Sequence, residues 1–288
     1  MSDIDLQFIQ HAAAYDWLDV VNVVFLILIV SEFAWDYAKR MRTKIAETLA
    51  NFAIAVGNLL LERTVFGLVF IVGLIITHEF APIVLPDTWW SWALALLVAD
   101  FSYYWMHRSE HSVRILWAYH SVHHSSPEFN LSTSLRLSWV EGVFEWVFFV
   151  PMILLGFSVS QTVVAILVVI TYQTWIHTER IGKLGWLDRV INTPSVHRVH
   201  HASNQHYHDK NFGGILMLWD RLFGTYKPEE DRIAYGITTS VGSANPITIN
   251  FHEFMAIARD AIRAGNWRDA LGFIFRGPGW QPSEVASK

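Results

Sequence analysis

Residues 140–177 read VEGVFEWVFFVPMILLGFSVSQTVVAILVVITYQTWIH, with two apolar runs at 140–155 and 160–176 and Gly156 and Ser158 between them. A helix of about 18–20 apolar residues can cross the hydrocarbon core of a bilayer, because eighteen residues rise roughly 27 Å. We therefore expect a tight helical hairpin that enters a membrane, turns, and returns to the side from which it came.

Histidines gather on both sides of this hairpin. The motif HxxxH occupies residues 107–111, HxxHH occupies 120–124 and again 197–201, and a single histidine follows the second run. Random scattering of the histidines would give only about 0.03 copies of HxxHH. The nine histidines of the pattern are His107, His111, His120, His123, His124, His177, His197, His200 and His201.

The spacing of these histidines indicates a metal site. On a helix, positions i, i+3 and i+4 lie on one face, so each HxxHH motif presents three imidazoles together. Because the hairpin returns the chain to its starting side, all nine histidines can meet at the inner boundary of the membrane. Neutral imidazole suits iron, zinc, copper or nickel, and a closed zinc site needs four ligands. Nine imidazoles therefore predict two six-coordinate ions with open positions.

The whole chain has the composition of a membrane protein. It is 52% hydrophobic and 16% charged, whereas soluble domains typically carry about a quarter charged residues. Three further apolar spans lie at 17–37, 48–80 and 89–106. The second is too long for one crossing, and Glu62 and Arg63 divide it, so it is one tilted helix or two helices. The competing interpretation is a large soluble all-helical protein.

Basic residues predict the orientation of the spans. They first appear after span 17–37, as the cluster Lys39, Arg40, Arg42 and Lys44. Loops 78–87 and 156–161 contain none. The positive-inside rule then places the N-terminus outside and the histidine motifs in the cytoplasm. Arg63 does not fit this pattern, and it would pair with Glu62 or extend to the interface.

Several classes of site and partner are excluded or disfavoured. The chain has no cysteine, which excludes disulfides, thiolate metal sites and iron–sulfur clusters. Its formal net charge of −5 gives no reason to expect nucleic acid. The acidic N-terminus has no basic region typical of a cleaved signal peptide. This start favours a bacterial inner membrane over the endoplasmic reticulum.

The predicted fold class is all-α: a multi-pass transmembrane helical bundle with a cytoplasmic, histidine-rich helical cap that holds two metals. Residues 1–93 would form the N-terminal membrane helices, 94–226 the catalytic region, and 227–288 a cytoplasmic tail. Within this tail, 249–264 has apolar residues at helical spacing. Such a helix packs on the core or lies in the membrane interface.

Metal-bound imidazoles need their second nitrogen fixed by a carboxylate or carbonyl. Asp100 lies seven residues before His107 on the same helix face, and Gln173 lies one turn before His177. The predicted supporting residues are Asp100, Asn130, Gln173, Asp209 and Asn211. Glu141 and Glu145 would line a substrate entry, bond histidines, or simply lie at the interface. The remaining histidines fit no ligand template: His11, His78, His206, His208 and His252.

Motifs in order along the chain resemble one known family. They are 100–108 (DFSYYWMHR), 123–133 (HHSSPEFNLST), 172–179 (YQTWIHTE), 197–201 (HRVHH), 209–211 (DKN) and 219–226 (WDRLFGTY). The chain resembles the fatty acid hydroxylase / sterol desaturase superfamily of membrane di-iron oxygenases, and especially its alkylglycerol monooxygenase-like branch. Residues 277–280 (GPGW) are similar to the tail of many bacterial members.

This resemblance implies two irons held by the nine histidines, O₂ as co-substrate, and hydroxylation of a lipid C–H bond of alkylglycerol, fatty acyl or sterol type. Zinc could replace iron during expression. Gln173 stands where the lipid 2-hydroxylase members have a further histidine, which leaves the ligand count at one ion open. The chain shows no flavin, haem or dinucleotide motif, so an electron-transfer protein or a diffusible reductant would supply electrons. The branch suggests tetrahydrobiopterin.

Three alternatives compete with the hydroxylase. The first is a desaturase of the same superfamily, which differs only in the fate of the substrate radical. The second is a histidine-rich metal transporter or sensor, whose ligands should lie near the middle of the membrane. The third is a zinc metalloprotease, which needs an HExxH-type motif that the chain lacks.

Overall fold

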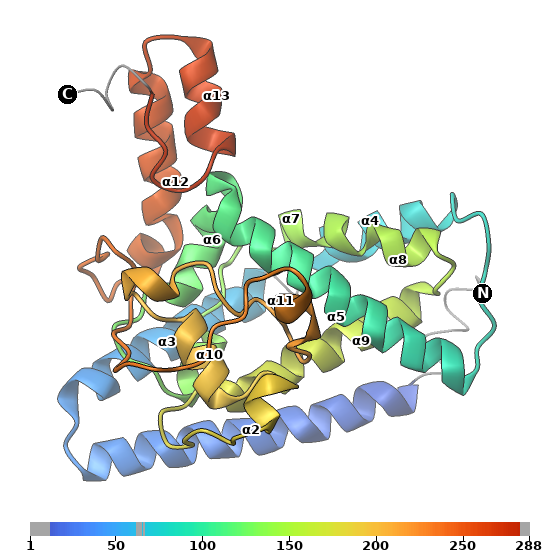
Figure 1. Cartoon of the computed structure of the whole chain (residues 1–288), viewed down its shortest axis with the longest axis horizontal. Coiled ribbons are helices and arrows are strands. Elements are labelled where there is room, and N and C mark those ends of the chain that lie inside the picture. Colours follow the sequence, from blue (N-terminus) through green and yellow to red (C-terminus); the bar gives the residue numbers. More distant parts are fainter. Residues whose placement is uncertain (1–11, 62–64, 66, 283–288) are drawn as a thin grey trace.

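The computed structural model describes residues 12–61, 65 and 67–282, and these residues form helices and no strands. Two isolated β-bridges, Ile191 with Leu216 and Ala202 with Tyr235, are the extended pairings among them. The predicted all-α class is confirmed. Long helices lie lengthwise beside one another (Figure 1).

The lengthwise helices are α2 (Ala12–Ala38), α3 (Arg42–Leu61), α4 (Gly67–His78), α5 (Trp89–Ser112) and α9 (Val159–Tyr172). Three segments are long and apolar enough to cross a membrane: Asp19–Ala38, Lys44–Leu61 and Val159–Ile176. The length and apolar composition of these three segments indicate an integral membrane protein. α5, which covers the predicted span 89–106, is not among the three, since its second half carries polar residues such as Asp100 and Ser102.

The stretch 48–80 forms two helices, α3 and α4, so a single tilted helix is wrong. Both are apolar, but α4 is shorter than a full crossing. Glu62 and Arg63, which we expected to divide the stretch, lie outside the described residues, as does His11.

The predicted hairpin has one continuous and one broken arm. Ser158 begins α9 by accepting a hydrogen bond from the Gln161 N–H, and Gly156 turns the chain with a φ of 97°. The first arm consists of α7 (Gly142–Glu145), η3 (Trp146–Phe149) and α8 (Val150–Leu154). Pro151 lacks an N–H and cannot continue an α-helical hydrogen-bond ladder. The expected full-length first crossing is therefore corrected to a shorter, irregular segment.

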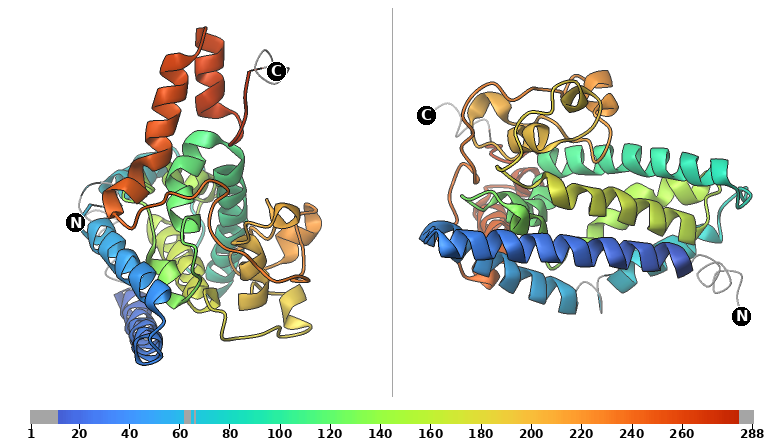
Figure 2. Two further views of the ribbon diagram at one scale, coloured as in Figure 1. Left: turned by 90° about the vertical axis from the view of Figure 1, so that its left-hand side faces the viewer. Right: turned by 90° about the horizontal axis from the view of Figure 1, so that it is seen from below.

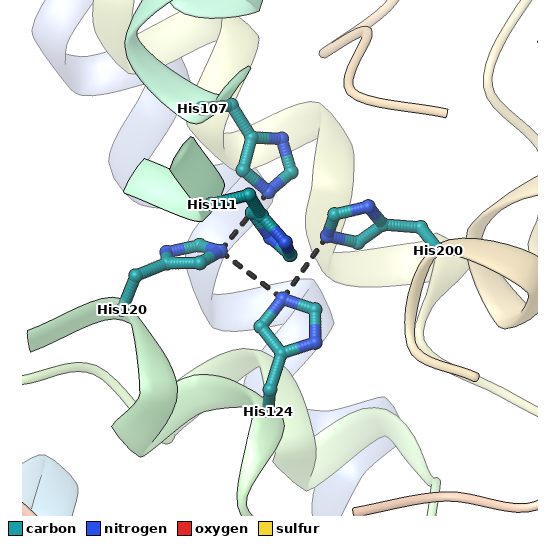
Figure 3. Close-up of side chains that lie close together, drawn as sticks. All are labelled: His107, His111, His120, His124 and His200. Carbon is teal, nitrogen blue, oxygen red and sulfur yellow. Dashed lines mark hydrogen bonds between the residues drawn. The ribbon is translucent and has the colours of Figure 1, made fainter. Parts of the chain in front are cut away.

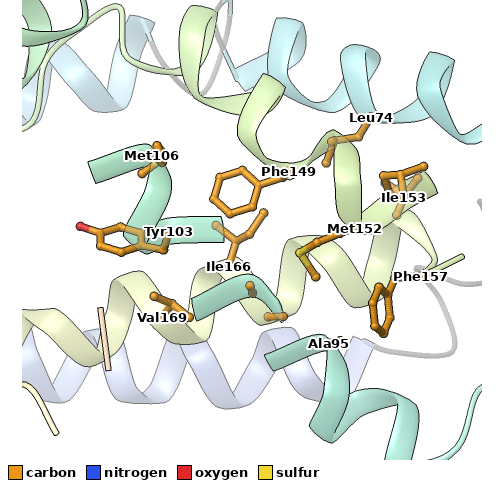
Figure 4. Close-up of a cluster of buried hydrophobic side chains, with 13 residues drawn as sticks. Leu74, Ala95, Tyr103, Met106, Phe149, Met152, Ile153, Phe157, Ile166 and Val169 are labelled. Carbon is orange, nitrogen blue, oxygen red and sulfur yellow. The ribbon is translucent and has the colours of Figure 1, made fainter. Parts of the chain in front are cut away.

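The main hydrophobic core runs along the bundle toward the histidine end (Figure 4). It joins side chains of α4, α5, η3, α8 and α9, including the buried Met152, Phe149 and Ile166. Tyr103 and Met106 of α5 complete this core, and His107 follows at once in the same helix. Packing of α5 in the core therefore positions the first histidine motif.

The short elements form the end that carries the histidines. They are α6 (Arg114–His124), η2 (Leu131–Leu135), η4 (Gln173–Ile176), η5 (Leu187–Arg189), α10 (Pro194–His200), η6 (Gln205–Tyr207) and α11 (Leu218–Leu222). The helix predicted at 249–264 is α12 (Pro246–Arg263), which is followed by α13 (Trp267–Phe275). These last two helices form a hairpin that runs crosswise to the long helices (Figures 1 and 2).

Candidate metal centre

Four segments far apart in the chain bring the nine histidines of the pattern together in two groups. Helix α5 supplies two histidines and α6 supplies three. One histidine directly follows η4, and the last three come from α10 and the residue that follows it. The group of five is His107, His111, His120, His124 and His200 (Figure 3). The group of four is His123, His177, His197 and His201. Within each group, one nitrogen from every residue lies within 4.8 Å of all the others.

Local helix geometry explains how each segment presents its histidines. α5 continues to Ser112, so His107 and His111 lie one turn apart. Val113 is extended and turns the chain from α5 into α6. Pro194 occupies the first turn of α10, where it is tolerated, and the Thr193 side chain accepts from the Val196 N–H.

The nitrogens face one another at a characteristic spacing. The Nε2 atom of His120 lies 3.1 Å from Nε2 of His107 and 3.1 Å from Nε2 of His124. In the other group, Nε2 of His177 lies 3.1 Å from that of His123 and 2.9 Å from that of His197. Adjacent ligands of a six-coordinate ion, at about 2.1 Å and a right angle, would be roughly 3.0 Å apart. The observed spacing fits such a donor set.

The outer nitrogen of each imidazole, meaning the ring nitrogen that points away from its group, shows which tautomer is present. His107 Nδ1 donates to Phe212 O at 3.0 Å, and His200 Nδ1 donates to Lys210 O at 2.9 Å. A neutral imidazole with a donating Nδ1 has a lone pair on Nε2. Nδ1 of His120 lies 3.1 Å from a Glu110 carboxylate oxygen, so it too is the protonated nitrogen of its ring. His107 and His120 therefore turn the lone pairs of their Nε2 atoms toward each other. A cation between them would relieve this repulsion.

Three histidines of the pattern that lie outside the long helices have lowered pKa values. Burial and the neighbouring imidazoles hold the pKa values of His124, His200 and His201 well below their usual range. Neutral imidazole is the form that binds metal. In addition, Nε2 of His111 is buried without a hydrogen-bond partner. The donor set, its protonation and this unpartnered atom all fit a metal site.

Comparison with known proteins identifies the region that carries these histidines. The family model for fatty acid hydroxylase matches residues 92–225. Residues 92–225 are thus similar to the fatty acid hydroxylase family. The resemblance stated from the motifs is thereby confirmed, and all nine histidines lie within the matched residues.

Similar proteins include alkylglycerol monooxygenases. The protein from Xenopus tropicalis is 36% identical over 273 residues, which cover 93% of this chain and 60% of the relative. The protein from Homo sapiens is 41% identical over 198 residues, which cover 69% of this chain and 44% of the relative. An ornithine lipid hydroxylase from Rhizobium tropici is 30% identical over 164 residues, which cover 54% of this chain and 49% of the relative. The chain thus spans less than two thirds of the length of each of these relatives. No solved structure matches the chain.

Two of the predicted supporting residues contact histidines. An Asp209 carboxylate oxygen lies 3.6 Å from Nδ1 of His111. Gln173 acts through its main chain, because its carbonyl oxygen accepts from His177 Nδ1 at 2.7 Å. The Gln173 side chain accepts instead from the Tyr103 hydroxyl at 3.0 Å.

The other three predicted supporting residues bond elsewhere, and none of them shows a histidine contact among the described residues. Asp100 accepts from the Ile215 and Leu216 N–H groups and from Trp219 Nε1. It therefore holds the loop whose Phe212 carbonyl accepts from His107.

Asn211 and Asn130 are likewise structural. The Asn211 side chain donates to the carbonyls of Val196 and Lys227, so it ties α10 to the segment after the domain. Asn130 caps η2 by accepting from the Ser132 N–H. Short polar side chains at loop and cap positions commonly satisfy the local backbone in this way, which is why the expectation of direct histidine contact fails.

Sequence reasoning missed Glu110, which is 1% exposed. One carboxylate oxygen contacts His120 Nδ1, and the other accepts from the Tyr119 hydroxyl at 2.8 Å. The signal was present, since Glu110 is the acidic residue inside the first HxxxH motif. The Phe212 and Lys210 carbonyls were missed as well, and a backbone carbonyl leaves no sequence signal.

A cavity of about 720 Å³ opens beside both groups of histidines. His124 and His200 of the group of five line it, as does His201 of the group of four. Loop 236–241 and one face of α12, including His252 and Glu253, form the opposite wall. His206 and His208, which fit no ligand template, bond instead to Asp231 and to the Ser203 carbonyl.

Proposed function

We propose that this chain is an O₂-dependent, non-haem di-iron monooxygenase that hydroxylates a C–H bond of a membrane lipid. The observation that carries the proposal is the convergence of nine buried or half-buried imidazoles into two donor sets, within the residues that match the fatty acid hydroxylase family model. Each set holds enough neutral nitrogen ligands for one iron.

The group of five would hold one iron, and the group of four would hold the other. Once bound, the two ions would supply the activation of O₂ that hydroxylation of an unactivated C–H bond requires. The protein's part is to fix the imidazoles and to exclude water. Phe129 serves the second purpose, since its ring centre lies 5.0 Å from that of His201 and 5.6 Å from that of His177.

We propose a multi-pass arrangement with both groups on the cytoplasmic side. Residues 1–93 would form the N-terminal membrane helices, 94–226 the catalytic region and 227–288 the cytoplasmic tail. The basic cluster after α2 supports this side, because Lys44 pairs with Glu179 at 2.8 Å, two residues beyond His177. Arg180 pairs with Asp36 near the end of α2 at 2.7 Å. The histidines and the basic loop are therefore at the same end of the bundle, and a bacterial inner membrane fits both.

For the substrate we propose a lipid with an alkyl chain, first an alkylglycerol and then a fatty acyl or sterol lipid. The similar alkylglycerol monooxygenases and ornithine lipid hydroxylase support a lipid. Electrons would come from an electron-transfer protein or from a diffusible reductant such as tetrahydrobiopterin.

Metal analysis and product analysis test the proposal together. The protein purified in detergent should contain about two irons per chain, and both His123→Ala and His200→Ala should lower that content. O₂ consumption with a hydroxylated lipid as product is the expected activity, whereas a new double bond would indicate a desaturase. Bound metal with no O₂ consumption on any lipid, with a reductant present, would contradict the oxygenase and favour a transporter or sensor.

A further inference from the structure

The hairpin of α12 and α13 carries apolar side chains that the protein leaves uncovered. On α13, Trp267, Leu271 and Phe275 are 68%, 44% and 60% exposed. They are spaced four residues apart and so form one stripe along the helix. On α12, Met255 and Ile262 are 57% and 85% exposed.

The opposite side of this hairpin is firmly packed. Ile249 and Ile257 of α12 are buried, and α12 and α13 both pack against α6. The Arg114 N–H at the start of α6 donates to the Arg276 carbonyl after α13 at 2.9 Å. The exposed stripe therefore belongs to a fixed element, held where α5 leaves the bundle.

The charges of the hairpin favour an anionic surface. Its acids Glu253 and Asp260 both pair with Arg114 of α6, at 2.7 and 2.8 Å. Arg259 also lies 3.7 Å from Asp260. In the rest of the hairpin, Asp269 is accompanied by three arginines, Arg263, Arg268 and Arg276.

Two of the arginines lie beside aromatic rings. The Arg268 guanidinium lies 5.5 Å from the ring centre of Trp267, and that of Arg276 lies 5.2 Å from Trp280. Arginine and tryptophan together are typical of the boundary between lipid headgroups and acyl chains.

The direction of the hairpin agrees with this boundary. It lies crosswise to the helices that are long enough to span a membrane, at one end of them (Figures 1 and 2). A helix that lies at the end of membrane spans and runs perpendicular to them lies along the membrane surface. An amphipathic helix there buries its apolar face about 5–10 Å into the boundary.

We propose that the α12–α13 hairpin docks on the surface of the bilayer that the long helices cross. The Trp267, Leu271 and Phe275 side chains enter the acyl-chain boundary, and the arginines contact lipid phosphates. This docking is independent of the catalytic activity. One consequence rests on the proposed function: the other face of α12 lines the cavity beside the histidines, so docking brings the cavity next to the lipid surface.

Fluorescence quenching by lipids tests the docking in the full chain. Because the chain has no cysteine, Leu271→Cys can carry a single polarity-sensitive fluorophore in nanodiscs that contain nitroxide-labelled lipid. Val56→Cys, 58% exposed in the span Lys44–Leu61, is the control within the membrane. Arg232→Cys, in an exposed part of the loop after the domain, is the control in water.

Quenching at residue 271 comparable to that at residue 56 would support the proposal. Quenching no greater than at residue 232 would overturn it. Disulfide cross-linking between chains through Leu271→Cys would also overturn it, because a second copy would then cover the stripe. Adding phosphatidylglycerol to phosphatidylcholine nanodiscs should increase the quenching at 271, and no change would overturn the role of the arginines. None of these readouts depends on lipid turnover.

Discussion

The two groups of histidines differ in how their imidazoles are held. In the group of five, the outer nitrogens of His107 and His200 donate to carbonyls, and those of His111 and His120 lie beside carboxylates. In the group of four, His177 donates to the Gln173 carbonyl.

The rest of the group of four has fewer outer contacts. Nδ1 of His123 and of His197 is buried without a hydrogen-bond partner. Packing supports this group instead, because the Phe129 ring centre lies 5.0 Å from that of His201, 5.6 Å from that of His177 and 6.3 Å from that of His197. Outer hydrogen bonds fix ring orientation and raise ligand basicity, so the group of five should bind its ion more tightly. The following predictions test that difference.

Removing one ligand from each group should have the largest effect. His197→Ala leaves three ligands in its group, whereas His107→Ala leaves four in the other. We expect both variants to lose nearly all lipid hydroxylation, and His197→Ala to lose one of two irons completely while His107→Ala retains part of both. Iron per chain, measured by mass spectrometry, checks this. Equal metal loss would show that the groups do not differ.

Glu110 tests whether outer bonds matter in the group of five. Glu110→Ala removes the carboxylate beside His120 and leaves the Tyr119 hydroxyl without its acceptor. Loss of such a partner costs about 10–100-fold in metal affinity or activity, and Glu110→Gln should recover part of it. Competition with a chelator measures the affinity. Wild-type affinity in Glu110→Ala would contradict a positioning role.

Asp209 should matter less than Glu110. Its side chain is 69% exposed and lies 3.6 Å from His111 Nδ1, so water screens the contact. We expect Asp209→Ala to lower metal affinity by less than about tenfold. Asp231→Ala is the matched control, because Asp231 is 68% exposed and contacts His206 instead. An equal effect of both substitutions would exclude a specific role for Asp209.

Phe129 probes the packing of the group of four and should give the smallest effect. Phe129→Leu keeps an apolar side chain at a buried site, which usually costs less than about 1.5 kcal/mol of unfolding free energy. We expect thermal unfolding to shift slightly and iron to be lost preferentially from the group of four. A change confined to the group of five would contradict packing as the support of the other group.

Much of this architecture could be predicted from the sequence because it depends on local rules. Apolar runs predicted membrane helices, and the i, i+3, i+4 spacing predicted which histidines share a helix face. The broken first arm could have been anticipated from Pro151, whereas the bonding of Asp100 could not. A carboxylate on the correct helix face can accept from any donor nearby, and only the folded chain brings Ile215, Leu216 and Trp219 to it.

The sequence by itself determined the helices, their apolar faces and the set of nine histidines, because helix periodicity is a property of neighbouring residues. The tertiary structure alone decided how that set divides. His123 and His124 are adjacent in the chain yet join different groups, and so do His200 and His201. Consecutive residues on a helix point about 100° apart, so the division depends on where α5, α6, η4 and α10 meet in space.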